Sequence, residues 1–134
     1  MIDFDILPKV VYNEMNEVHN EEVALINGLE PLLRDDDIEA IEKQLDLIFS
    51  HTIDHFQNEQ RLMQEVGFPA YIMHKSEHDR VLNEMQMTVM NWRTQKDNKI
   101  LQTYFFHTIP QWLAIHIASM DTVTAQFICM HKKC

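Results

Sequence analysis

The chain has 134 residues, 46% of them hydrophobic, and a formal net charge of -10 at pH 7 with neutral histidines. Such an acidic surface argues against nucleic acid and anionic membranes as partners. No apolar run of transmembrane length and no basic leader stand out, so we expect a cytoplasmic protein without a membrane partner.

The first predicted helix begins near Asn13, which can serve as its N-cap. Apolar residues and one histidine then recur every three or four positions, as on one face of an α-helix. Gly28 and Pro31 weaken the last turn, where we expect a kink or a stop. The face reads Met15, His19, Val23, Ile26, Leu29 and Leu33.

The second predicted helix follows Asp35 to Asp37, which cap it and complement its dipole. Its buried face keeps the same steps of three and four, and Gly67 is suited to the position just beyond its last turn. The face reads Ile38, Ile41, Leu45, Ile48, Thr52, His55, Glu59, Leu62 and Val66.

The third predicted helix has Pro69 in its first turn. Its face contains Tyr71, His74, His78, Leu82 or Val81, Met85, Val89 and Trp92, and the polar residues 93–99 connect it to the next helix.

The fourth predicted helix covers 100–128, and Pro110 should either kink it or mark the start of its main part. Its face reads Leu101, Phe105, Ile109, Leu113, His116, Met120, Val123 and Phe127.

Four helices with short connections, only two glycines and no linker or repeat predict an all-α fold. We expect an up-down-up-down four-helix bundle with a short N-terminal arm, in which residues 1–134 form a single domain.

Polar residues that can bind metals interrupt all four apolar faces. On a helix, residues four apart point almost the same way, about 40° around the axis. His55 and Glu59 therefore share a direction, and so do His74 and His78. In an up-down bundle these residues, His19 and His116 lie at compatible depths.

A shared metal site is the simplest partner for this set. A single buried histidine is usually a satisfied core residue, but five imidazoles and one carboxylate would need separate partners that the apolar faces do not offer. Neutral imidazole and carboxylate are standard ligands of iron, manganese and zinc. The sequence therefore predicts a metal site at one end of the bundle, with room for two ions.

Asp121 is a less regular candidate for the same site. It follows His116 by five residues, which on an ideal α-helix is about 140° of rotation. A π-type turn would bring the two side chains onto one face. We therefore predict a local irregularity near 117–120, and a regular α-helix there would argue against Asp121 as a ligand.

This pattern resembles the hemerythrin family. The resemblance rests on His19 in "NEVHNEEVALIN", on "HFQNEQRLM" (His55 and Glu59), on "HKSEH" (His74 and His78), and on "WLAIHIASMD" (His116 and Asp121). It covers residues from about 12 to 125 and is most similar to bacterial single-domain hemerythrins.

The resemblance implies reversible binding of dioxygen at a non-haem di-iron centre, and thus a protein that is not an enzyme. His74, His78 and His116 would hold one iron, and His19 and His55 the other. Glu59 and Asp121 would bridge the two irons together with an oxo or hydroxo group. The resemblance also implies that Trp112 and Leu113 line the dioxygen pocket, with oxygen carriage, storage or sensing as the role and no assigned protein partner.

Two alternatives remain open. A di-iron redox enzyme could act on peroxide, dioxygen or nitric oxide, but the Glu-x-x-His pairs of ferritin-like oxidases are absent from the sequence. A purely structural bundle could bind zinc or no metal at all.

The remaining histidines and the cysteines are expected to lie outside the site. His51 should flank it or face solvent, and His107 should be on the surface. Cys129 and Cys134 do not indicate a disulfide framework, and we expect the tail "CMHKKC" to be disordered.

Overall fold

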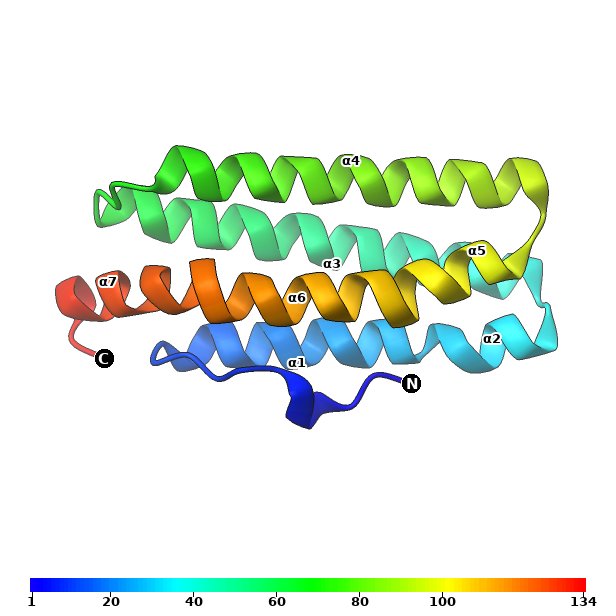
Figure 1. Ribbon diagram of the computed structural model, residues 1–134, viewed down its shortest axis with the longest axis horizontal. Helices are drawn as coiled ribbons and strands as arrows, with labels where there is room; N and C mark the ends of the chain where they lie inside the picture. The colour runs from blue at the N-terminus through cyan, green and yellow to red at the C-terminus, as the bar shows by residue number, and fades with distance from the viewer.

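A computed structural model describes residues 1–134 as four long helical rods, arranged side by side and alternating in direction (Figure 1). The first rod consists of α1 (Asn13–Asn27) and α2 (Leu29–Asp35), the second of α3 (Ile38–Glu65), and the third of α4 (Tyr71–Gln95). No strand is present. The predicted all-α up-down-up-down bundle is confirmed.

The fourth rod is one continuous helical stretch built from five segments. These are α5 (Asn98–Thr103), the π-helical η2 (Tyr104–Thr108), α6 (Ile109–His116), the π-helical η3 (Ile117–Asp121) and α7 (Thr122–Lys132). Pro110 neither breaks this rod nor begins it. It lies in the first turn of α6, directly after η2, where a widened turn can relieve the clash between the proline ring and the preceding carbonyl.

The ends of the helices follow the local chemistry, with some differences from the prediction. Asp37 caps α3 by accepting a hydrogen bond from the Ala40 N–H, and Gly67 takes the left-handed conformation after α3 at φ 66°. Asn13 is the first residue of α1 and not its cap. Pro69 precedes α4, which begins at Tyr71.

The connections are shorter than expected. Only Lys96 and Asp97 separate α4 from α5, although the sequence predicted a polar connection over 93–99. Gly28 separates α1 from α2, as the sequence indicated.

The predicted helix faces form most of the core, although Val66, Tyr71, Val89, Met120 and Phe127 are only half-buried and two other residues are exposed. Ile38 is 51% exposed because it lies at the N-terminus of α3. Val123 is 54% exposed, since η3 shifts the inward face of the last helix by one residue. Beyond His116 the buried residues are Ile117, Asp121, Thr124, Ala125 and Ile128.

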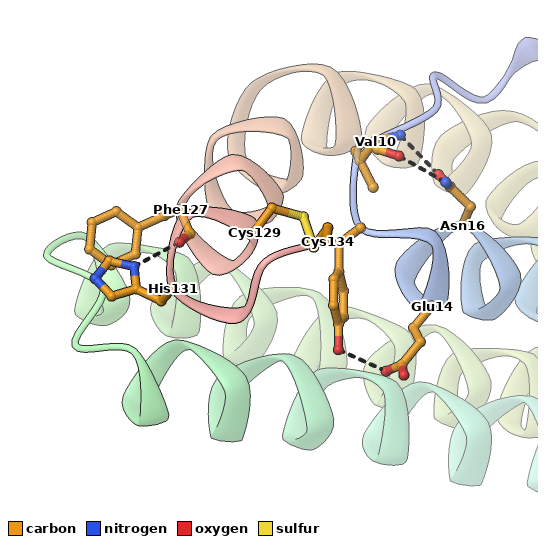
Figure 2. The surroundings of a disulfide bond; sticks show 8 residues. Val10, Glu14, Asn16, Phe127, Cys129, His131 and Cys134 are labelled. Atoms are coloured by element: carbon orange, nitrogen blue, oxygen red, sulfur yellow. Dashed lines mark hydrogen bonds between the residues drawn. A yellow bond between two sulfur atoms is a disulfide. The ribbon is translucent and has the colours of Figure 1, made fainter.

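The N-terminal arm runs along α1 and contains the short 3-10 helix η1 (Phe4–Ile6) (Figure 1). Ile2 exchanges two hydrogen bonds with the side chain of Asn27, at 2.7 and 2.9 Å. Val10 makes a similar pair with Asn16, at 2.9 Å each (Figure 2). These bonds fix the arm to α1.

The C-terminal tail differs from the prediction. α7 continues to Lys132, and Cys129 and Cys134 form a disulfide across the final turn, near Val10 (Figure 2). Neither cysteine is a free thiol. The expected disordered tail was wrong because α7 extends far enough to bring the two cysteines together, with Cα atoms 4.9 Å apart.

The stretch Asn98–Lys132 is long and apolar enough to cross a membrane by length and composition, contrary to the expectation from the sequence. A helix that buries an apolar face in the core of a helical bundle can have the same composition. Here it carries the buried residues His116 and Asp121.

Candidate metal centre

Seven polar side chains meet inside the bundle, and each is at most 6% exposed. They come from all four rods: one from α1, two from α3, two from α4, and two from the last rod. The set is His19, His55, Glu59, His74, His78, His116 and Asp121. These are the seven residues that the sequence singled out.

The two carboxylates each face two groups of histidines. Glu59 Oε1 lies 3.4 Å from His74 Nε2 and 3.3 Å from His78 Nε2. Its other oxygen, Oε2, lies 2.6 Å from His55 Nε2 and 3.8 Å from His19 Nε2. The carboxylate thus lies between a group from α4 and a group from α1 and α3.

Asp121 repeats this arrangement from the opposite rod. Its Oδ1 lies 3.0 Å from His74 Nε2 and 3.2 Å from His116 Nε2, whereas its Oδ2 lies 3.0 Å from His19 Nε2. The π-helical turn η3 makes this possible, because a wider turn returns the fifth residue to the face of the first. The predicted irregularity is confirmed. Thr122 Oγ1 stabilises it by donating a hydrogen bond to the Ile117 carbonyl, at 2.7 Å.

Many buried nitrogen and oxygen atoms of the site find no hydrogen-bond partner among the neighbouring side chains. Seven of the nine buried side-chain nitrogen and oxygen atoms without a hydrogen-bond partner belong to His19, His55, Glu59, His78 and Asp121. In addition, the Nε2 atoms of His74 and His116 face each other at 3.1 Å. Orphaned donors and acceptors in an apolar interior are costly. Cations between them would satisfy the set, so the residues fit a metal centre.

Burial and the short distances between these groups shift their pKa values in the metal-free protein. Burial would raise the pKa of both carboxyl groups, but the surrounding histidines outweigh it, so that Glu59 and Asp121 keep a pKa well below the usual range. Burial lowers the pKa of His78. For His74, burial is outweighed by Asp121 and Glu59, which raise its pKa to about 9. The carboxylates therefore stay ionised.

Several histidines are oriented by partners that the sequence did not reveal. His74 Nδ1 lies 2.9 Å from Thr124 Oγ1, and His78 Nδ1 lies 3.0 Å from Gln60 Oε1. A bond at Nδ1 directs Nε2 toward the centre and fixes the tautomer that a metal requires. Thr124 was overlooked because the predicted face contained Val123 in its place.

Glu22 is the other residue that the sequence analysis missed. It is 5% exposed, accepts a hydrogen bond from Thr52, and contacts His51. One of its oxygens lies 3.9 Å from His55 Nδ1. Burial would raise the pKa of Glu22, but His51 and its other partners lower it to about 2. His51 thus flanks the centre, as expected, and its other nitrogen faces Glu21 at 3.1 Å.

A small cavity adjoins His55. Its free volume is about 10 Å³, close to the minimum that holds one water molecule. The lining is mostly apolar and includes Trp112 and Leu113, together with Phe56, Val81, Met85 and Ile109. His107, by contrast, is exposed on the surface of the last rod.

Comparison with known proteins agrees with this geometry. Residues 10–128 match the family described as "Hemerythrin HHE cation binding domain". The chain is 34% identical over 112 residues to the bacteriohemerythrin of Aquifex aeolicus (strain VF5), a match that covers 84% of this chain and 86% of that protein. It is 30% identical over 109 residues to a hemerythrin-like protein of Naegleria gruberi, covering 81% of this chain and 78% of the relative. The chain belongs to the hemerythrin family and is a metal-binding four-helix bundle.

Proposed function

We propose that this protein binds dioxygen reversibly at a di-iron centre and serves in oxygen carriage, storage or sensing. The observation that carries the proposal is the division of both carboxylates between two unequal histidine groups. His74, His78 and His116 would hold one iron, and His19 and His55 the other. Glu59 and Asp121 would bridge the pair, together with an oxo or hydroxo group.

The donor set supports one free position at this centre. Five imidazole nitrogens and four carboxylate oxygens, with one bridging solvent atom, are one donor short of two six-coordinate ions. The group with only two histidines is the one that lacks a donor. Its His55 borders the small cavity, so the cavity adjoins the place where a diatomic ligand would bind. The bound irons would supply electrons to dioxygen when it binds and would regain them when it is released.

The residues around the cavity favour reversible binding over turnover. Leu113 is 3% exposed and places apolar surface beside His55. Trp112 stacks on His116 with ring centroids 4.5 Å apart and donates a hydrogen bond to Glu77 at 2.8 Å. Such walls exclude water and its protons, which would otherwise assist the irreversible loss of reduced oxygen species.

The test is an optical titration of protein that has been loaded with ferrous iron in the absence of oxygen. A visible charge-transfer band should appear when oxygen is admitted and disappear when it is removed. A band that decays to a stable ferric spectrum would favour the redox-enzyme alternative. Bound iron without any band would refute dioxygen binding.

A further inference from the structure

A second hollow lies next to the small cavity beside His55, on the face between α3 and α4. It is an open groove of about 360 Å³. Leu45, Met85 and Phe105 are buried in its floor, and Met90 at its rim is 62% exposed. Phe49, Val89, Asp46, Gln86 and Arg93 complete the lining.

The groove and the small cavity share one lining residue, Met85. Its side chain lines both hollows and is only 2% exposed. Methionine is unbranched and has three rotatable bonds, so it can change conformation with less disturbance than a branched side chain. A rotation of Met85 would therefore connect the outer groove with the space beside His55.

Other walls of the cavity are fixed by specific contacts. Trp112 is bound to Glu77, which in turn accepts a hydrogen bond from Arg80 at 2.7 Å. Phe56 stacks on His78 with ring centroids 3.9 Å apart and nearly parallel planes.

On the α1 side, Glu22 is bound by both His51 and Thr52. Met85 makes no hydrogen bond and is the wall best able to move.

We propose that small neutral gas molecules reach the metal centre through the α3–α4 groove, with Met85 as the gate. The inference rests on the proposed function, since it assumes that dioxygen is the ligand. The apolar floor of the groove offers nothing to replace the hydration shell of an anion, so charged oxygen species would be held back on either side. The net charge of -10 acts in the same direction on approaching anions.

Two exposed methionines on α4 provide a matched test by dioxygen kinetics. Met90 lies on the groove and Met87 lies outside it, and both are 62% exposed. Met90→Trp should lower the association and dissociation rate constants of dioxygen together, by roughly threefold to tenfold, and leave the equilibrium affinity within a factor of about two. Met87→Trp should change neither rate. Met85→Ala should raise both rates, and Met90→Trp carries the test alone if that variant does not fold.

Xenon provides a readout that does not depend on iron chemistry. Crystals of the iron-loaded protein under xenon pressure should show the gas in the groove against Met85, and Met90→Trp should abolish this site. Xenon absent from the groove, or dioxygen rates unchanged in Met90→Trp, would overturn the route. If xenon binds there and the wild-type protein forms no oxygenated complex, the route stands as a gas site and the proposed function alone fails.

Discussion

In the metal-free protein, three histidines of the site have a raised pKa, which strengthens the competition between protons and a metal for their nitrogens. Burial opposes the charge on His74, yet Asp121 and Glu59 raise its pKa to about 9. Burial would also lower the pKa of His55 and of His19, but neighbouring carboxylates again raise each pKa above the ordinary value. Because metals bind neutral imidazole, the apparent metal affinity should increase with pH.

The size of the effect follows from the pKa of His74. Below that pKa, each displaced proton changes the apparent association constant about tenfold per pH unit. Between pH 7 and its pKa of about 9, deprotonation of His74 alone should raise the apparent association constant of the metal roughly 100-fold. His55 and His19 would steepen the dependence further.

The stability of the metal-free protein should change in the opposite direction. A histidine with a raised pKa contributes stability that is complete below the unfolded pKa of 6.5 and is lost as the pH rises through about 9. For His74, this difference corresponds to about 3 kcal/mol of unfolding free energy. The melting temperature of the metal-free protein should therefore fall over the same interval in which its metal affinity rises.

Anaerobic calorimetric titration with ferrous iron at several pH values measures the affinity. The same titration in two buffers that differ in ionisation enthalpy gives the number of protons released. We expect at least one proton per protein molecule near pH 7, contributed by His74. An affinity that is independent of pH across this interval, with no proton released, would refute the electrostatic reasoning.

Three substitutions test individual parts of the centre. Glu59→Ala removes both oxygens of the carboxylate that lies between the two histidine groups and should lower the iron content, whereas full occupancy by two irons would contradict the proposed bridge. Leu113→Ala should speed autoxidation of the proposed oxygenated protein by admitting water beside His55, and an unchanged rate would refute a protective role for Leu113. Thr124→Val keeps the shape but leaves His74 Nδ1 without its partner, so a chelator competition should show roughly 10- to 100-fold weaker metal binding.

Six of the seven residues of the centre could be found from the sequence because they are polar residues on predicted apolar helix faces. Asp121 lies off the predicted face and was identified from its five-residue spacing to His116 and from the resemblance to hemerythrins. His55 and Glu59 occupy positions that helical periodicity assigns to the core, where an unpaired polar group is costly. The same contradiction recurs on every helix. A common partner was therefore the economical explanation before any distance was known.

The residues that orient the histidines could not be found in this way. Gln60 is only half-buried, and nothing in its own helix marks it as different from a surface glutamine. Its hydrogen bond to His78 joins α3 to α4 and depends on how the two helices are rotated against each other. Glu22 likewise acquires its role from Thr52 and His51 on a neighbouring rod.

The π-helical turn η3 was predicted from the sequence, but its effect on the rest of the helix was not. The five-residue spacing of His116 and Asp121 required a wider turn, and η3 provides it. A wider turn also adds one residue to the helical register, so every inward position after it moves by one. Applying that shift to the rest of the helix would have replaced Val123 by Thr124 in the predicted core. The turn that brings Asp121 to the centre thus also places Thr124 beside His74, and one backbone irregularity supplies both a candidate ligand and the partner of another.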